Sequence, residues 1–183
     1  MPLILVIISL IVASSAHAQG ARTIGDLISG PGLVVDGDTF DIGSERIRIW
    51  GIDAPEGKAS CYRDGQRWRP AADSASELRE CLKGTMVTCR VQKIQRRWER
   101  LRFVSECWRN DSKQDIAECM VRSGWATDYP GYSGRHYERW EAEPKARRTG
   151  LWQCDGPLPT ERWCKDGDSV PCERIYKPSG PSH

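Results

Sequence analysis

Residues 33–56 constrain the fold of this chain more than any other part of its 183-residue sequence. Two strand-like runs flank Gly43 and Ser44, and such a pair between two runs is typical of a tight turn joining antiparallel strands. Gly51 then interrupts the second run, which indicates a bend or a bulge in the strand. The stretch therefore predicts a β-hairpin whose second strand changes direction near its end.

Charged residues gather toward one end of this predicted hairpin. Asp36 and Asp38 share a face if they lie in one strand, because side chains alternate with period two. Arg48 and Asp53 would lie on opposite faces of a straight strand, but a bend near Gly51 would turn them toward each other. Three carboxylates and an arginine suit a hard cation and a phosphate. We expect Asp36 to support the turn rather than to bind a ligand.

The same stretch resembles the signature of the staphylococcal nuclease-like (thermonuclease) family. The resemblance is carried by V-D-G-D-T at residues 35–39 and by I-R-I-W-G-I-D-A-P-E at residues 47–56. It continues at residues 82–84, at residues 121–126, at Tyr137 and Glu141, and at residues 150–152. It thus covers about residues 33–152. It implies an α+β fold, mainly β, built on a five-stranded oligonucleotide-binding (OB) barrel with about three helices.

The residue chemistry and the resemblance predict the same reaction, a metal-assisted hydrolysis of phosphodiester bonds. Asp38 and Asp53 supply hard oxygen ligands, with the Ala54 carbonyl as a third, and such a set suits Ca²⁺. Glu56 is the candidate general base for the attacking water. Arg48 would clamp the phosphate with a planar fork and stabilise the charge that develops in the transition state.

Residues 95–102 depart from the family pattern at the place of a second catalytic arginine. Relatives typically carry D-x-Y-G-R there, whereas this chain has R-W-E-R-L-R at residues 97–102. Alignment on Val104 and Cys107 assigns the role to Arg102, with Arg100 as the alternative. The aspartate, tyrosine and glycine of the family pattern are missing in either alignment.

The same region predicts contacts with a nucleic acid. Six basic residues and one acid occur from Arg90 to Arg102, with Trp98 among them. Basic groups interleaved with an aromatic side chain can hold a phosphate backbone and stack a base. A solvated hairpin tip is the alternative. Tyr129 and Tyr132 resemble family tyrosines that line the nucleotide pocket, or they cover the mouth of the barrel.

The two ends of the chain predict export and an extension. Residues 1–18 resemble a secretory signal peptide, with an apolar run and an A-x-A cleavage site that ends at Ala18. A short membrane anchor is the alternative, although the run is too short to span a bilayer comfortably. We expect residues 19–32 to be a polar lead-in and residues 153–183 to be a cysteine-containing extension without chemistry of its own.

Eight cysteines follow the predicted signal peptide, and export favours disulfides among them. No pair has C-x-x-C spacing, which does not favour a structural zinc site. Most of the 105 possible pairings cannot be ranked from sequence. Cys89 closes the strand-like run at residues 85–89, and Cys107 closes the run at residues 103–107, within predicted strands at residues 85–94 and 101–108. An antiparallel pairing of these strands would make the two sulfurs neighbours.

Three helices are predicted from apolar spacing and terminal residues. Residues 70–82 carry an apolar stripe at helical spacing after Pro70. Asp115 can cap a short helix that ends at Gly124. Ser133 can cap a last helix that continues to Thr149, with Pro144 bending or breaking it.

Two functions from different classes follow from these patterns. The first is an exported, Ca²⁺-dependent endonuclease, monomeric and free of stable membrane association, that cleaves DNA and RNA. The second is an OB-fold protein with little or no catalysis that binds nucleic acid or serves an accessory role, for example in exopolysaccharide production, where some members of the family are encoded. The formal net charge of only +2 requires local clustering of basic residues for either function.

Overall fold

The computed structural model describes residues 21–97, 99–156, 158 and 160. Five strands form a closed barrel in the order β1-β2-β3-β8-β7. They are β1 (Leu27–Val34), β2 (Thr39–Ile42), β3 (Glu45–Ile49), β7 (Met86–Arg97) and β8 (Arg100–Arg109). All neighbouring strands pair antiparallel except β3 and β8, which are parallel. The five-stranded barrel predicted from the sequence is confirmed.

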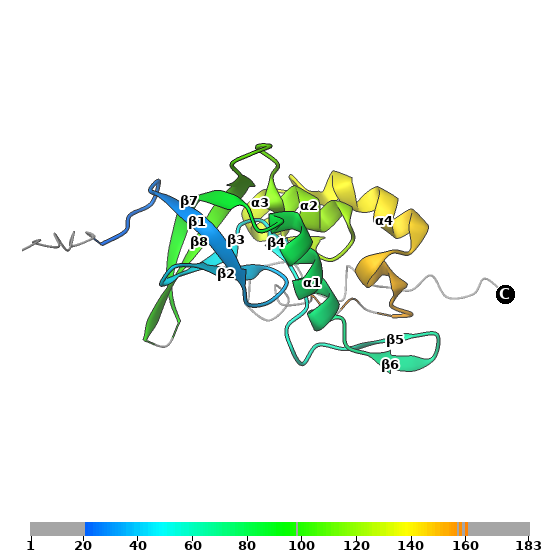
Figure 1. The fold of residues 1–183 in the computed structure, drawn as a ribbon. Coiled ribbons are helices and arrows are strands. Elements are labelled where there is room, and N and C mark those ends of the chain that lie inside the picture. Colours follow the sequence, from blue (N-terminus) through cyan, green and yellow to red (C-terminus); the bar gives the residue numbers. More distant parts are fainter. Residues whose placement is uncertain (1–20, 98, 157, 159, 161–183) are drawn as a thin grey trace, which may run out of the picture.

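The remaining elements surround the barrel. Two small sheets pair β4 (Ile52–Asp53) with β9 (Thr127–Asp128), and β5 (Cys61–Arg63) with β6 (Gln66–Trp68). The helices are α1 (Ala71–Leu82), α2 (Ile116–Arg122), α3 (Pro130–Ser133) and α4 (Ala142–Arg147), with 3-10 turns η1 (Glu138–Glu141) and η2 (Gly150–Gln153). In Figure 1 the barrel lies to the left, the helices to the right, and the β5–β6 hairpin below them.

The alternation of side chains along β3 separates the core from the site. Ile47 and Ile49 are fully buried in the apolar core together with Phe40. Because successive side chains point to opposite faces of a strand, Arg46 and Arg48 point away from this core. The strand thus fixes Arg48 to the barrel by the burial of its two isoleucine neighbours, which stabilise it by about 1.5–3 kcal/mol each.

The first two helices form where their residue patterns predict them. Helix α1 buries Ala75, Leu78 and Leu82 on one stripe and ends at Lys83, which adopts a left-handed conformation. Helix α2 begins after Asp115, whose carboxylate accepts hydrogen bonds from the amides of Ala117 and Glu118 at 2.8 and 3.3 Å. The two helices pack against each other beside the barrel.

The barrel begins earlier than the sequence patterns predicted. Strand β1 starts at Leu27, within residues 19–32 that were expected to be a lead-in. Gly30, Pro31 and Gly32 favour a loop by local propensity. The structure needs a small residue there, because a Cβ at Gly30 would lie 2.5 Å from Cγ2 of Ile42 on β2. Close packing between strands therefore overrides local propensity at this edge of the barrel.

The position expected for the first aspartates is also wrong. Asp36 and Asp38 lie in the turn between β1 and β2 and not in a strand. One carboxylate oxygen of Asp36 accepts the amide of Asp38 at 3.1 Å, a local bond that is typical of turns built by aspartate. The turn places the two carboxylates by hydrogen bonding rather than by strand alternation.

The last predicted helix is divided. Ser133 ends α3 instead of capping a long helix, and Gly134 follows in a left-handed conformation. Helix α4 begins only at Ala142, which places Pro144 in its first turn. A proline is tolerated in the first turn because its missing N–H has no partner within the helix there. The expected break at Pro144 thus occurs as a helix start after the turn η1.

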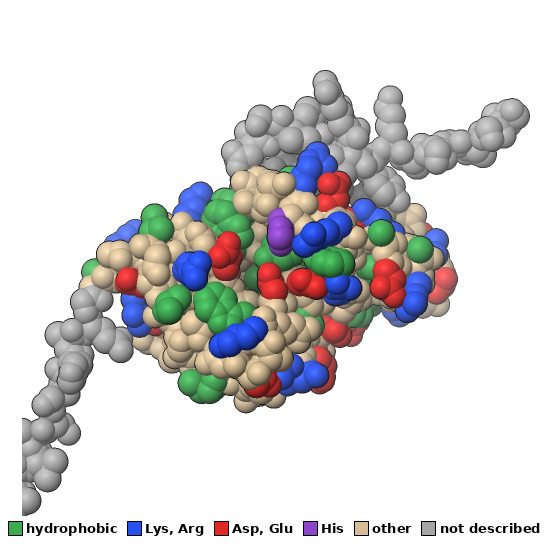
Figure 2. Space-filling model, turned by 90° about the horizontal axis from the view of Figure 1, so that it is seen from above, with side chains coloured by type: hydrophobic (Ala, Val, Ile, Leu, Met, Phe, Trp, Pro, Cys, Tyr) green, Lys and Arg blue, Asp and Glu red, His purple; other side chains and the backbone are tan. Residues whose placement is uncertain are grey.

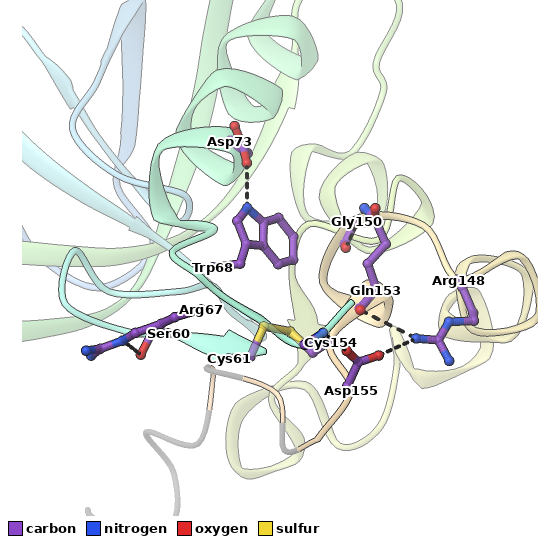
Figure 3. The surroundings of a disulfide bond; sticks show 11 residues. Ser60, Cys61, Arg67, Trp68, Asp73, Arg148, Gly150, Gln153, Cys154 and Asp155 are labelled. Carbon is purple, nitrogen blue, oxygen red and sulfur yellow. Dashed lines mark hydrogen bonds and ion pairs between the residues drawn. A yellow bond between two sulfur atoms is a disulfide. The ribbon is translucent and has the colours of Figure 1, made fainter. Parts of the chain in front are cut away.

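Three disulfides link the described residues: Cys61–Cys154, Cys81–Cys119 and Cys89–Cys107. The predicted Cys89–Cys107 pair is confirmed, since the two residues are register partners on β7 and β8. Cys81–Cys119 joins α1 to α2. Cys61–Cys154 fastens the β5–β6 hairpin to the end of η2, where Arg148 also pairs with Asp155 at 3.0 Å (Figure 3). Cys164 and Cys172 lie outside the described residues, as do the predicted signal peptide and most of the predicted extension.

We expect reduction of the disulfides to destabilise this fold strongly. Each native disulfide lost from a small exported domain typically costs about 2–5 kcal/mol, because the unfolded chain regains freedom. Urea unfolding with and without a reductant measures the change, and thiol titration of the native protein should find few or no free thiols. An unchanged unfolding midpoint, or a majority of free thiols, would contradict this expectation.

Among the described residues, no helix has the length and apolar composition needed to cross a membrane.

Candidate active site

Arg48 lies at the centre of the charged cluster and joins its two best-buried carboxylates. Its Nη1 donates to Oδ1 of Asp38 at 2.8 Å, and its Nη2 donates to Oδ1 of Asp53 at 2.7 Å. Asp38 and Asp53 are 2% and 1% exposed. The convergence that the sequence predicted for these three residues is thus present in the structure.

The bend after β3 brings Asp53 to Arg48. Gly51 adopts a φ of +79°, a left-handed conformation that other residues rarely take. A Cβ at this position would also lie 2.7 Å from Cε2 of Tyr137. The chain then re-enters a sheet as β4, which pairs with β9. Gly51 therefore satisfies both the backbone reversal and the close approach that the site requires.

Asp38 ties together three segments of the site. Its Oδ1 accepts the hydroxyl of Thr39 at 2.9 Å in addition to Arg48, and its Oδ2 accepts the amide of Ala54 at 3.2 Å. The turn after β1, strand β3 and the segment after β4 are thereby held in one arrangement. Ala54 is itself buried, and its amide lies at the Asp38 carboxylate, while a ligand role for its carbonyl stays a prediction.

The balance of charge in the cluster is negative. Burial lowers the pKa of Arg48, but the charges of Asp38, Asp53 and Glu56 outweigh burial and raise it, so the guanidinium stays protonated. Burial and then the charge of Asp38 raise the pKa of Asp36 to about 6. Asp36 supports the turn by accepting a hydrogen bond from the amide of Asp38.

The donor chemistry of the cluster fits a hard cation. Asp38 and Asp53 present carboxylate oxygens from two different segments, and the Ala54 carbonyl is the third predicted ligand. Oxygen atoms of this kind are the ligands that Ca²⁺ takes in proteins. Within residues 21–97, 99–156, 158 and 160, no group of three or more His, Cys, Asp or Glu side chains is arranged to hold a metal ion. Ca²⁺ at these residues therefore stays a prediction.

Glu56 lies at the open side of the cluster. Its side chain is 51% exposed, and its Oε1 is 3.9 Å from Nη1 of Arg48. A base for water needs access to solvent and proximity to the phosphate-binding group, and Glu56 has both.

Arg102 faces the cluster across a small hollow, which we call the catalytic hollow. The hollow is lined by Arg48, Asp53, Gln95, Arg97, Arg102, Tyr129 and Tyr132. Arg102 donates from Nε and Nη2 to Oε1 of Gln95, at 3.2 and 2.6 Å. Arg100 is exposed at the hairpin tip and is not part of the lining. Of the two arginines left open by the sequence, the structure thus brings Arg102 to the site. Trp98 lies outside the described residues.

The strand register explains this placement. Arg48 on β3 is the register partner of Val104 on β8, and Arg102 precedes Val104 by two residues. Side chains two apart share a face, so Arg48 and Arg102 lie on the same outer face of the barrel.

The two predicted tyrosines form one wall of the hollow. Tyr129 is 8% exposed and meets Tyr132 edge to face, with 4.8 Å between ring centroids. The Tyr132 ring stacks on Trp50 at 4.8 Å, and its hydroxyl accepts hydrogen bonds from Gln95 and Lys93 at 3.0 and 3.2 Å. Tyr132 is thereby held in place from both sides.

The sequence patterns missed Trp50, Lys93 and Gln95 as members of this wall. The position of Gln95 could have been predicted by placing the hairpin turn at residues 98 and 99, because that register puts Gln95 opposite Arg102. Nothing local in the sequence indicates that Trp50 stacks on Tyr132, since 82 positions separate the two residues in the chain.

Comparison with known proteins agrees with this geometry. The sequence profile of the family described as "Staphylococcal nuclease homologue" matches residues 46–154. The chain is 32% identical over 139 residues to "Succinoglycan biosynthesis protein ExoI" of Rhizobium meliloti (strain 1021), covering 75% of this chain and 69% of that protein. It is 31% identical over 122 residues to "Probable endonuclease LCL3" of Candida tropicalis, covering 62% of this chain and 50% of that protein.

A third relative is "Probable staphylococcal-like nuclease CAN3" of Oryza sativa subsp. japonica, 31% identical over 122 residues, or 66% of this chain and 29% of that protein. The chain thus spans half or less of the two nuclease-named relatives. The matched region contains Arg48, Asp53, Glu56 and Arg102, which the structure places around one hollow. The chain belongs to the staphylococcal nuclease homologue family.

Proposed function

We propose that this protein is an exported, Ca²⁺-dependent endonuclease that hydrolyses phosphodiester bonds in DNA and RNA. The observation that carries the proposal is the buried guanidinium of Arg48, held by Asp38 and Asp53 and flanked by Glu56 and Arg102. The names of two relatives, a probable endonuclease and a probable staphylococcal-like nuclease, support the same reaction class.

The residues of the site divide the work of hydrolysis. Arg48 donates one N–H group to each aspartate. A guanidinium has five N–H donors, so others remain for a phosphate oxygen. Arg102 approaches the same hollow from β8 and would neutralise charge on the opposite side of the phosphate. Glu56 would accept the proton of a water as that water attacks phosphorus and the bond to the leaving oxygen breaks.

Asp38 and Asp53, with the Ala54 carbonyl, would hold Ca²⁺. The ion would supply polarisation of a phosphate oxygen and a lower pKa of a nearby water. The hydrogen bonds of Asp38 to Thr39 and Ala54 keep its carboxylate oriented for this role. Tyr132, fixed between Trp50 and Gln95, would limit the positions open to the nucleotide.

A second candidate function is that of an accessory protein with little catalysis. It is favoured by the name of the Rhizobium relative, which assigns that protein to succinoglycan biosynthesis. It is also favoured by residues 97–102, which lack the family's aspartate, tyrosine and glycine. A wild-type protein that binds nucleic acid but hydrolyses it at background rate would support this second function.

We expect cleavage of plasmid DNA and of RNA by the mature chain to require a divalent cation and to prefer Ca²⁺. The reason is an all-oxygen donor set with no histidine or cysteine among the predicted ligands. Digestion is compared in Ca²⁺, in excess chelator, and after Ca²⁺ is restored. Asp53→Asn is the matched variant, and it should raise the Ca²⁺ concentration needed for activity. Full cleavage in chelator would rule out this mechanism.

A further inference from the structure

A second cavity adjoins the wall of the catalytic hollow at Trp50, which stacks on Tyr132. It encloses about 600 Å³ and is lined by Trp50, Arg90, Glu106, Cys107, Trp108, Lys113, Asp115, Ser133, His136 and Tyr137. We call it the distal pocket. Figure 2 looks onto the face that carries the one histidine of the described residues, with basic, acidic and apolar side chains around it. A volume of this size accommodates a nucleotide-sized ligand.

Trp50 connects the distal pocket to the catalytic hollow. It lines the distal pocket, and it also stacks on Tyr132, which lines the hollow. Trp108 also lines the distal pocket, and the guanidinium carbon of Arg90 lies 5.7 Å from the centre of its ring. Ring contacts thus link Tyr129, Tyr132 and Trp50, and Trp50 and Trp108 line the same pocket. Such a series of rings is the kind of surface on which successive unpaired bases stack.

A β-bulge aligns basic side chains along the route between the two cavities. Arg90 pairs with Glu106, whereas Lys93 pairs with Val104, so one extra residue separates Arg90 from Lys93. Without this bulge the two cations would point to opposite faces of β7. With it they share a face, and Arg97 continues the row at the tip. At about 3.3 Å per residue, the distance from Gln95 to Arg90 is roughly 15 Å, a few nucleotides of a bound strand.

The cations of this row on β7, and Lys113 after β8, have no acidic partner among the residues that the structure describes. Among the described residues, Arg90, Lys93, Arg97 and Lys113 form no ion pair, whereas Arg22, Arg46, Arg122 and other arginines are paired with carboxylates. Unpaired cations on one face attract a phosphate backbone. Arg90 of this row lines the distal pocket together with Lys113, which follows β8 in the chain.

The carboxylates of the distal pocket favour a base over a free phosphate inside it. Asp115 is engaged by the amide of Ala117 and by the hydroxyl of Tyr137, at 2.8 and 2.9 Å. Glu106 forms no hydrogen bond or ion pair with the described residues, so its oxygens can accept from the amino group of a base. A bare anion would be repelled by both groups, while a stacked base would not.

We propose that the distal pocket is a second nucleotide subsite, in which an unpaired base of a single-stranded substrate stacks on Trp108 while Arg90 and Lys113 hold its phosphate. The row of cations on β7 carries the strand from this subsite to the catalytic hollow. The proposal rests on the proposed nuclease function and adds to it a substrate class, single strands long enough to reach both cavities.

The test compares a long and a short ligand on Trp108→Ala. A labelled single strand of about 12 nucleotides should bind roughly 5- to 150-fold more weakly, the range typical of one lost base–aromatic stack. Binding is measured in the Glu56→Gln background so that the strand is not cut. Turnover and KM for a chromogenic phosphodiester of one nucleotide, measured with Glu56 intact, should be unchanged. Trp108→Phe, which keeps a ring, should restore most of the strand affinity and controls for folding.

Two further measurements test the base contact and the phosphate contact separately. A blunt duplex of the same length has no unpaired base, so its binding should not depend on Trp108. Arg90→Gln should lower the salt dependence of strand binding by about 0.7 in the log–log slope, whereas Arg79→Gln, an equal charge change on the exposed side of α1, should not. The Arg79 variant separates a local phosphate contact from the effect of net charge.

The possible outcomes test the distal subsite and the nuclease function independently. Equal losses on the strand and on the short diester, or no loss on the strand, would overturn the distal subsite. A wild-type protein that binds strands but cleaves neither substrate would refute the nuclease function, and the Trp108 comparison would still decide the subsite. A wild-type protein that binds no strand would overturn both.

Discussion

Replacing Arg48 with lysine is expected to lower the turnover of phosphodiester cleavage by roughly 10³- to 10⁵-fold, the range seen for arginines that stabilise phosphoryl-transfer transition states. The guanidinium donates to Asp38 and Asp53 from two different nitrogens and still has N–H groups for a phosphate. A lysine ammonium keeps the charge but cannot meet three acceptors in one plane. The kcat of the purified variant on plasmid DNA and on a short diester measures the loss.

Arg48→Ala should also lower the folding stability, because it removes the positive charge as well as the hydrogen-bond donors. It leaves Asp38 and Asp53 buried beside each other without a cation, and breaking a buried pair of this kind typically costs about 3–5 kcal/mol. Arg46→Ala is the matched control on β3, since Arg46 pairs with the half-buried Asp41 and should cost about 1 kcal/mol or less. Equal unfolding free energies for the two alanine variants would contradict the central role of Arg48.

Measurement of turnover also decides whether Arg102 or Arg100 acts in catalysis. Arg102→Ala should reduce turnover to an extent comparable with Arg48→Lys, because Arg102 lines the catalytic hollow. Arg100→Ala should mainly weaken binding and lower the salt slope, since Arg100 is exposed at the end of the hairpin. If substitutions of Arg48, Arg100 and Arg102 each lowered the turnover of an active enzyme by a small and equal factor, a clamp of two arginines would be refuted.

Glu56→Gln is expected to lower turnover by about 10² to 10⁴ while it leaves the affinity for nucleic acid nearly unchanged. The substitution preserves the shape of the side chain but removes its capacity to accept a proton. The half-exposed position of Glu56 at 3.9 Å from Arg48 predicts little effect on folding stability. Single-turnover cleavage and equilibrium binding of the same oligonucleotide separate the two effects.

Glu80→Gln provides the control for Glu56, since Glu80 is exposed on α1 and has the same charge. It should change neither turnover nor affinity. Loss of affinity in Glu56→Gln without loss of turnover would show that Glu56 binds the metal or the substrate instead of acting as a base. Unchanged kinetics would mean that another group accepts the proton.

Local sequence patterns predicted the parts of the fold that depend on neighbours in the chain. The turn at Gly43 and Ser44, the apolar stripe of α1 and the cap at Asp115 follow from turn chemistry, helical spacing and capping. The same holds for the bend at Gly51, because a left-handed residue is a local requirement. The residues of the charged cluster were predicted for a related reason, as Asp38, Arg48, Asp53 and Glu56 lie within one short stretch whose pattern resembles a known family.

Long-range packing decided the features that local patterns predicted wrongly. Strand β1 contains glycine and proline and has weak strand propensity, but its pairing with β2 and β7 closes the barrel. The last helix breaks at η1 and begins again before Pro144, where its missing N–H is tolerated. For β1, the free energy of closing the barrel exceeds the small preferences of single residues.

By itself, the sequence determined the chemistry of the protein: which carboxylates and which arginine cluster, that Cys89 and Cys107 pair, and to which family the pattern belongs. Only the tertiary structure decided where that chemistry acts. The parallel register of β3 and β8 brings Arg102 and not Arg100 to Arg48, and the bulge in β7 turns Arg90 and Lys93 to one face. Register depends on contacts between residues far apart in the chain, which no local pattern encodes, and a shift of one residue reverses the face of every side chain.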